Sequence, residues 1–192
     1  EVPPSGGIWA PTIRYHAGCF YMVTTNFSTG GNFLVHTDDP EGEWSDPVWI
    51  DIPGIDPSLY FEGDRCFFTA NAGEERKHGL YLAEIDPKSG EVLAPSRLIW
   101  EGSGGAYPEA PHIYRRPDGY YLIAAESGTQ NGHCITAARS KKIEGPYEPC
   151  PHNPIHTHRH RIDQAIMGAG HADFLEDGDG RWWAFMLAFR IT

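Results

Sequence analysis

Residues 109–123 decide the fold class, and they read Glu-Ala-Pro-His-Ile-Tyr-Arg-Arg-Pro-Asp-Gly-Tyr-Tyr-Leu-Ile. A polar lead residue, Glu109, is followed by an apolar anchor, Ile113, then by a turn and an aromatic pair, Tyr120-Tyr121. β-Branched and aromatic residues on both sides of a Pro-Asp-Gly turn are typical of two paired strands. The stretch therefore predicts a β-hairpin.

Three other segments repeat this order of lead residue, anchor, turn and aromatic pair. The four anchors, Ile13, Leu59, Ile113 and Phe174, follow one another at intervals of 46, 54 and 61 residues. Two more strand-like runs follow each of the first three hairpins, and four strands in a unit of about 50 residues are typical of a β-propeller blade. We therefore predict an all-β propeller, with a β-sandwich as the alternative. The aromatic pairs are Phe20-Tyr21, Phe67-Phe68, Tyr120-Tyr121 and Trp182-Trp183.

The repeat divides the chain into three whole units and a partial one. The predicted blades cover approximately residues 1–52, 53–103 and 104–152, and a partial blade covers residues 165–192. A propeller needs at least four blades. We therefore expect the whole of 1–192 to form a single partial propeller domain of about three and a half blades from a larger ring.

Composition excludes several classes of protein. The chain has 192 residues, 40% of them hydrophobic and 12% aromatic, which is enough to form a core. Its net charge is −11 with no block of basic residues, so we expect neither a nucleic-acid partner nor a membrane surface. No run of 18 apolar residues predicts a membrane-spanning helix. The four cysteines lack a Cys-x-x-Cys spacing, and we expect free thiols in a reducing compartment.

The lead residues of the four hairpins are Trp9, Asp56, Glu109 and His171. Because the first strand of each blade lines the channel of a propeller, we expect these side chains to converge there. A carboxylate pair is what glycoside hydrolysis needs, and an indole face suits the C–H side of a sugar ring. Each residue also has a structural interpretation: Asp56 as a turn residue, Glu109 as a solvated strand end, and Trp9 and His171 as core residues.

The motifs around these positions resemble glycoside hydrolase family 43, and in particular its β-xylosidase branch. The matching stretches occur in the order of the family and cover nearly the whole chain. They are Ser5-Gly-Gly-Ile-Trp-Ala-Pro-Thr-Ile-Arg-Tyr, Gly54-Ile-Asp-Pro-Ser-Leu, Glu109-Ala-Pro-His-Ile-Tyr, Ala137-Ala-Arg-Ser, Gly145-Pro-Tyr-Glu, Asn153-Pro-Ile and Gly170-His-Ala-Asp.

The resemblance implies a five-bladed propeller and an inverting glycosidase that requires no cofactor. It implies that Glu109 is the general acid and that Asp56 orients this acid and modulates its pKa. It implies that Trp9 is a wall of the pocket for the terminal sugar. His171 corresponds to an axial histidine, which in some relatives helps to hold a calcium ion through water. The implied substrate is a xylo-oligosaccharide or an arabinosyl glycoside, and we expect a cytoplasmic enzyme.

The family's general base has no counterpart in these residues. In the family it is an aspartate in a Pro-Asp-Pro-Ser-type motif, upstream of the Trp-Ala-Pro segment that begins here at Trp9. A substrate-binding arginine is also expected beyond Thr192, because Arg190 lies too close to His171. We therefore expect the first blade and the end of the last blade to lie outside this chain, and the isolated chain to be inactive.

Two other functions stay open. One is a non-catalytic, carbohydrate-binding propeller; the other is a retaining fructan or sucrose hydrolase, whose Arg-Asp-Pro and Glu-Cys motifs do not occur here. His156, His158 and His160 would share one face if their segment is extended, which could bind a metal, although a plain loop is the favoured interpretation. The stretch Asp177-Gly-Asp-Gly predicts a β-turn rather than a calcium site.

Overall fold

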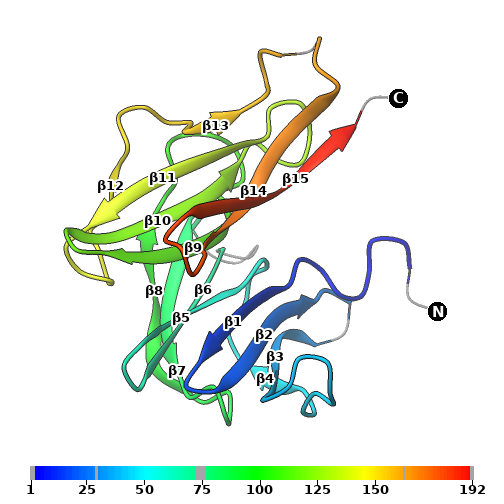
Figure 1. Ribbon diagram of the computed structural model, residues 1–192, viewed down its shortest axis with the longest axis vertical. Helices are drawn as coiled ribbons and strands as arrows, with labels where there is room; N and C mark the ends of the chain where they lie inside the picture. The colour runs from blue at the N-terminus through cyan, green and yellow to red at the C-terminus, as the bar shows by residue number, and fades with distance from the viewer. Residues whose placement is uncertain (1–2, 29, 72–76, 162, 191–192) are drawn as a thin grey trace. The chain divides into compact units, whose positions relative to one another are not determined.

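The computed structural model describes residues 3–28, 30–71, 77–161 and 163–190, and the chain forms two compact units, Glu1–Ile99 and Trp100–Thr192. All the regular elements of the described residues are strands (Figure 1), and none of these residues forms a helix. It follows that the described part contains no helix long and apolar enough to cross a membrane. The all-β prediction is confirmed.

The first unit contains two four-stranded sheets, and in each of them every strand pairs with the next one in the chain. This meander is the arrangement of a propeller blade. The first sheet consists of β1 (Thr12–His16), β2 (Cys19–Asn26), β3 (Gly31–Thr37) and β4 (Val48–Ile50). The second sheet consists of β5 (Ser58–Glu62), β6 (Arg65–Asn71), β7 (Leu80–Ile85) and β8 (Val92–Trp100), so that β8 ends on the first residue of the second unit.

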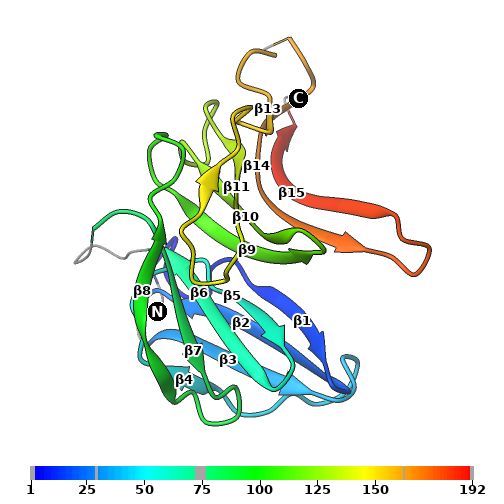
Figure 2. The same cartoon turned by 90° about the vertical axis from the view of Figure 1, so that its left-hand side faces the viewer.

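The second unit contains a larger sheet and a long hairpin. The sheet consists of β9 (Glu109–Arg116), β10 (Gly119–Glu126), β11 (Cys134–Ser140) and β12 (Glu148–Pro149), and β13 (His156–Thr157) pairs with the other end of β11. The hairpin consists of β14 (Ile166–Glu176) and β15 (Trp182–Arg190), and β14 packs against β9, β10 and β11 (Figure 2). The third sheet therefore extends to residue 157, beyond the predicted blade of residues 104–152.

The core of the first unit lies between its two sheets. Alternate residues of the central strand β6, Cys66, Phe68 and Ala70, are each 1% exposed and pack on the same face. Cys66 fits this core as a small apolar residue, and burial raises the pKa of its thiol to about 12. All four cysteines are free. The other buried members of the core are Tyr21, Val23, Leu34, Ile50, Ile52, Leu59, Ala83 and Ile85.

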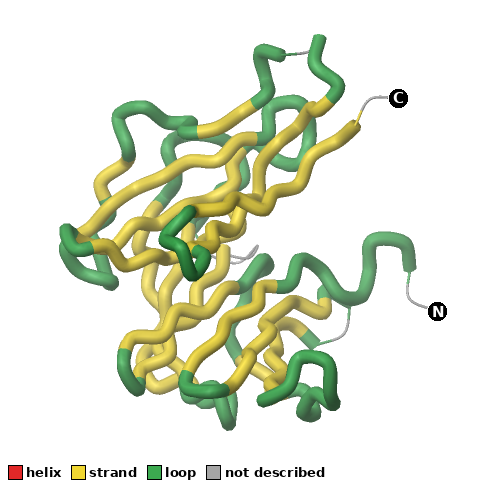
Figure 3. The backbone as a smooth tube through the Cα atoms, viewed as in Figure 1, coloured by secondary structure: helices red, strands yellow, loops and turns green. Residues whose placement is uncertain are grey.

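The predicted hairpins are present, with each aromatic pair on the second strand: β2, β6, β10 and β15. The described backbone consists of strands and of the loops and turns that join them (Figure 3). The β1–β2 turn has positive φ at both Ala17 and Gly18, which is the turn that matches the twist of paired strands. The turn predicted at Asp177 is also confirmed, since Gly180 N donates to Asp177 O at 2.9 Å. Ile13 is 49% exposed, because β1 directs Thr12 inward instead.

A buried polar link joins the first sheet to the loop before β5. Asn32 is 1% exposed, and its Nδ2 donates to Ile52 O at 2.7 Å and to Gly54 O at 3.2 Å. Its Oδ1 accepts a hydrogen bond of 2.6 Å from Thr25 Oγ1. A buried amide that is fully paired holds its partners in one arrangement, because any other arrangement leaves polar groups unpaired. Asn32 therefore fixes the backbone that precedes Asp56.

We predict that Asn32→Ala destabilises the first unit. The substitution leaves two carbonyls and one hydroxyl without this partner, and the expected loss in the free energy of unfolding is about 2–3 kcal/mol. Urea unfolding of the chain measures it. The matched control is Asn131→Ala at an exposed position, for which we expect a change of about 0.5 kcal/mol or less. Equal effects of the two substitutions would contradict the role of Asn32.

Candidate functional site

Trp9 lies in the segment that enters β1, and four contacts hold it. Trp9 N donates to Thr25 O at 2.9 Å, and the hydroxyl of the buried Thr24 donates to Trp9 O at 2.9 Å. The indole Nε1 donates to Ser5 O at 2.8 Å. The indole stacks on Phe27, with ring centroids 4.0 Å apart and planes inclined by 7°. Trp9 is thus a half-buried ring in a fixed orientation, with one face covered by Phe27.

Asp56 lies just before β5 in a left-handed conformation. It is 7% exposed and has a φ of 54°, which disfavours a residue with a Cβ by about 1–2 kcal/mol. The preceding residue Ile55 is held by Asn71, whose Oδ1 accepts from Ile55 N at 2.9 Å, and whose backbone N donates to Ile55 O at 3.3 Å. A Cβ on Gly54 would lie 2.3 Å from Asn71 O, so this approach requires glycine. These contacts fix the two residues that lead into Asp56.

Glu109 is the first residue of β9, half-buried, and it pairs with Ala125 of β10. The next pair in the ladder joins His112 to Ile123, so two residues of β9, Ala110 and Pro111, lie opposite one residue of β10. This is a β-bulge, and Ala110 occupies it with a φ of 49°. Bulges bend a strand and redirect its side chains, and they are frequent beside active sites.

His171 lies at a similar bulge in β14. Gly170 pairs with Leu187 and Asp173 with Phe185, so His171 and Ala172 oppose a single residue, and the φ of His171 is 50°. Burial lowers the pKa of His171, and this outweighs the opposite effect of the nearby Asp173 carboxylate. The shift favours the neutral form of the imidazole.

The four lead residues differ in their distance along the chain from the anchor residue, and the residues with positive φ show this. Asp56 and His171 lie three residues before their anchors, and at that place the third sheet has Ala110. Glu109 and Trp9 lie four residues before theirs. The lead residues therefore occupy two different positions relative to their anchors, and the backbone angles locate the bulges beside Glu109 and at His171.

Within the second unit, a group of buried and half-buried side chains joins the strand of Glu109 to that of His171. The hydroxyl of Tyr114 donates to Asp173 Oδ1 at 2.7 Å and accepts from Phe174 N at 2.8 Å. His112 Nδ1 lies 3.7 Å from the same carboxylate oxygen. β9 and β14 are therefore tied together directly beside the candidate residues. Sequence reasoning missed this link, although Asp173 belongs to the Gly-His-Ala-Asp motif.

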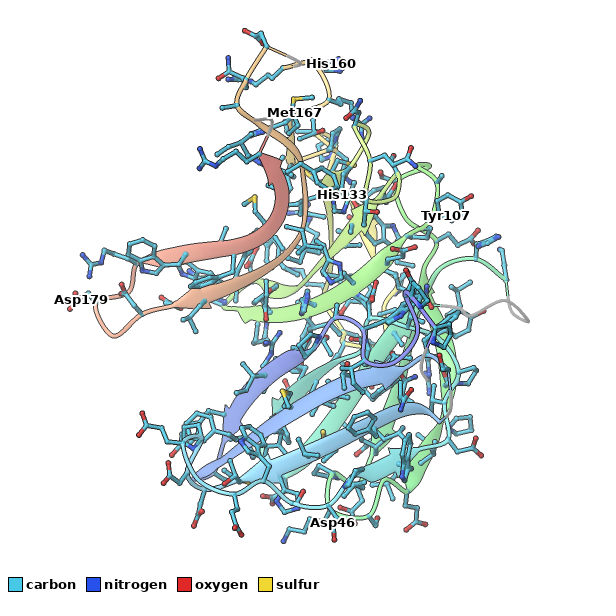
Figure 4. All side chains as sticks on the ribbon, turned by 90° about the vertical axis from the view of Figure 1, so that its right-hand side faces the viewer. Asp46, Tyr107, His133, His160, Met167 and Asp179 are labelled. Atoms are coloured by element: carbon cyan, nitrogen blue, oxygen red, sulfur yellow. The ribbon has the colours of Figure 1, made fainter. Side chains whose placement is uncertain are left out.

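His133 packs against the start of β14 and forms a hydrogen bond with its backbone. It is 2% exposed, and its Nδ1 makes a hydrogen bond of 2.9 Å with Gly168 O, next to Met167 (Figure 4). Burial lowers the pKa of His133 and so favours its neutral form. A Cβ on Gly170 would lie 2.5 Å from the His133 ring, so the ring occupies the space that a side chain at position 170 would need.

The rings of His156 and His158 lie 5.2 Å apart, centroid to centroid, but the segment of residues 156–160 is not extended throughout. The strand ends at Thr157, and His160 lies in a turn. His158 Nδ1 is hydrogen-bonded to Ile166 O at 2.7 Å. Within the described residues, no three or more His, Cys, Asp or Glu side chains gather in a way that could hold a metal ion.

The comparisons with known proteins agree on one family. The family described as glycosyl hydrolases family 43 matches residues 2–191. The chain belongs to this family. It is 43% identical to a xylosidase/arabinosidase from Butyrivibrio fibrisolvens, over 99% of this chain and 40% of that protein. It is 39% identical to a non-reducing end alpha-L-arabinofuranosidase from Bacteroides ovatus, over 97% of this chain and 35% of that protein.

Solved structures of the family have the same fold. A xylan beta-1,4-xylosidase from Bacillus halodurans superposes with a TM-score of 0.90 at 35% identity, covering 98% of this chain and 38% of that one. A family-43 protein of the xyloglucan locus of Bacteroides ovatus superposes with a TM-score of 0.91 at 38% identity, covering 97% of this chain and 37% of that one. The partial β-propeller is thereby confirmed. The chain spans about 40% of the length of these family 43 relatives.

The burial of His133 predicts a pH dependence of stability. Since the folded state favours the neutral imidazole, the unfolded state binds more protons below about pH 6.5. The free energy of unfolding should therefore fall as the pH drops through that value, and it should fall less in His133→Asn. Urea unfolding at pH 7.5 and 5.5 measures the difference.

The matched control for this prediction is His152→Asn, which removes an exposed histidine. We expect this variant to show the same loss of stability between the two pH values as the unsubstituted chain. A His133 variant that loses as much stability as the unsubstituted chain would show that His133 does not cause the pH dependence.

Proposed function

We propose that the whole protein is an inverting glycoside hydrolase that removes terminal xylose or arabinose from xylan-derived oligosaccharides. The observation that carries the proposal is Glu109, presented at a β-bulge within the family motif Glu109-Ala-Pro-His-Ile-Tyr. The names of the relatives support the substrate class, since they describe xylosidases, arabinosidases and an arabinofuranosidase. One sugar pocket can accept both pentoses because they place their hydroxyls similarly.

In this proposal Glu109 is the general acid. It donates a proton to the glycosidic oxygen as the bond to the leaving sugar breaks, while a second carboxylate activates water on the opposite face of the ring. Asp56 orients Glu109 and holds it protonated, because a neighbouring negative charge disfavours ionisation of a carboxyl group. Trp9 lies against the terminal sugar with the indole face that Phe27 leaves free.

The general base is proposed to lie outside these 192 residues. The resemblance assigns that role to an aspartate in a motif for which this sequence has no match. The described chain then supplies the acid and its modulator, and the water-activating group comes from another part of the protein. We propose a cytoplasmic location for the whole enzyme, in keeping with the free thiols.

Calcium fits the described residues poorly. This ion takes six to eight oxygen ligands, whereas His171 offers a ring nitrogen, and no acidic cluster gathers in the described part of the chain. A calcium ion near His171 would have to be held through water. No step of the proposed reaction passes through it.

The second candidate is a carbohydrate-binding propeller without catalytic activity. A whole protein that lacks the general-base aspartate would favour it, because a protein with Glu109 and Trp9 but no base could bind a sugar without hydrolysing it. The kinetic behaviour of Glu109 variants separates the two functions.

We predict that Glu109→Gln in the whole protein removes most of the activity on xylobiose and less of the activity on activated aryl xylosides. General acid catalysis contributes about 10²–10⁴-fold, and a good leaving group needs little of it. Steady-state kinetics on both substrates measures the ratio. Equal losses would contradict the role of Glu109 as the acid, and sugar binding without any hydrolysis by the unsubstituted protein would favour the second candidate.

The isolated 192-residue chain serves as a further control in these assays. It should hydrolyse neither substrate, with or without Glu109→Ala. Hydrolysis that disappears in the Glu109→Ala chain would show that the described residues include a base or obtain one from a second chain.

We also predict that Asp56→Asn in the whole protein moves the alkaline limb of the pH–rate profile to lower pH. Without the neighbouring charge Glu109 loses its proton at a lower pH, so the protonated acid disappears earlier as the pH rises. The dependence of kcat/KM on pH for an aryl xyloside measures the shift. An unchanged alkaline limb would exclude the modulating role of Asp56.

A further inference from the structure

Glu126 is the last residue of β10, and its side chain is 1% exposed. It follows Ala125, the residue that pairs with Glu109 across the ladder. An ionisable side chain this deeply buried is unfavourable unless hydrogen bonds replace its hydration. The hydrogen-bond donors around Glu126 therefore show which segment its carboxylate holds in place.

The carboxylate of Glu126 accepts four hydrogen bonds, and three of them come from the loop that precedes β9. Ser103 N donates to Oε1 at 2.7 Å, Ser103 Oγ donates to Oε2 at 3.0 Å, and Gly105 N donates to Oε2 at 2.7 Å. The fourth donor is the hydroxyl of Thr136 on β11, at 2.8 Å from Oε1. All four donors are uncharged, so the contact is a set of directed hydrogen bonds and not an ion pair.

The loop approaches the carboxylate as closely as its glycines allow. A Cβ on Gly105 would lie 2.4 Å from Glu126 Oε2, and a Cβ on Gly102 would lie 3.0 Å from Oε1 and 3.2 Å from Cβ of Pro108. The backbone of the loop also contacts the residue after Glu126, because Ser127 N donates a hydrogen bond of 2.6 Å to Ala106 O. The glycine-rich stretch of residues 102–105 is therefore shaped around one buried carboxylate.

The loop ends on the candidate acid. Tyr107 (Figure 4) has a φ of 53°, Pro108 is buried, and Glu109 follows directly. A displacement of the loop would be carried into the start of β9, where the bulge at Ala110 already bends the strand. General acid catalysis depends on the direction of the carboxyl group as well as on its proton, and an error of about 1 Å can lower a rate 10²-fold.

We propose that Glu126 is a positioning residue, whose carboxylate holds the loop of residues 102–107 against the end of β10 and thereby sets the direction of Glu109. Glu126 acts through the loop and does not contact the substrate. The inference rests on the proposed function for the role of Glu109, whereas its first half, that the carboxylate holds the loop, stands on the contacts alone.

The test is Glu126→Gln in the whole protein. The amide nitrogen of glutamine is a donor, so in either orientation it faces a backbone N–H, of Ser103 or of Gly105, and one of these bonds is lost. We expect kcat/KM for xylobiose to fall about tenfold or more beyond the fall for an activated aryl xyloside, because only the first substrate needs a well-directed acid. Equal falls on both substrates would overturn the positioning role.

The matched control is Thr136→Val, which removes a hydrogen bond from the same carboxylate but not from the loop. It should leave the ratio between the two substrates unchanged. A shift as large as that of Glu126→Gln would show that the ratio reports stability alone. Should Glu126→Gln fail to fold, Ser103→Ala removes a single loop contact at an exposed residue, and it should move the ratio in the same direction.

Amide hydrogen exchange tests the loop without reference to activity. At least one of the two amides, of Ser103 or of Gly105, should exchange about tenfold faster or more in Glu126→Gln, and both should exchange at an unchanged rate in Thr136→Val. Unchanged exchange in Glu126→Gln would overturn the inference. If the unsubstituted whole protein hydrolyses neither substrate, the proposed function fails, and the exchange rates still decide whether Glu126 holds the loop.

Discussion

At or just before each candidate residue the backbone departs from the regular pairing of a sheet, and there its polar groups need other partners. Buried side chains supply them in all four cases. A buried backbone group without a partner is unfavourable by about 1–3 kcal/mol, so each side chain selects one path for the segment it binds. The pairs, with the side chain first, are Thr24 with Trp9, Asn32 with Gly54, Glu126 with Gly105, and His133 with Gly168.

The same contacts make strained backbone tolerable where the candidate residues lie. Asp56, Ala110 and His171 are left-handed residues with a Cβ, and such conformations persist only where the surroundings determine them several times over. In the third sheet and in the β14–β15 hairpin, the left-handed residue coincides with a bulge that redirects the strand. The conformation at each of these residues therefore depends on the buried polar groups near it as well as on its strand.

Much of the fold could be predicted from the sequence because it depends on local patterns. The hairpin of residues 109–123 shows its anchor, turn and aromatic pair within 15 residues, and three repeats of that order predict the meander sheets. The β-turn at Asp177 was likewise visible in a short motif. The family resemblance rested on motifs of the same kind, and the comparisons confirmed it.

The buried side chains that hold the segments near the candidate residues could not be predicted from a local sequence pattern. Glu126 bonds a loop more than 20 residues away, and His133 bonds a carbonyl 35 residues away. Neither contact has a period or a motif, so only the three-dimensional structure shows them. The bulge at Ala110 was not predicted for a related reason, because alanine gives no sequence signal for a positive φ. Residue types suggested where chemistry could occur, and the tertiary contacts showed what holds those residues in place.

A crystal structure of the whole protein with xylose or arabinose bound tests the central claim most directly. The account predicts that the Glu109 carboxyl lies within hydrogen-bonding distance of the anomeric oxygen of the sugar. It also predicts that Asp56 lies beside that carboxyl and that the free face of Trp9 lies against the sugar ring. A pentose bound with Glu109 out of reach of its anomeric oxygen would contradict the account.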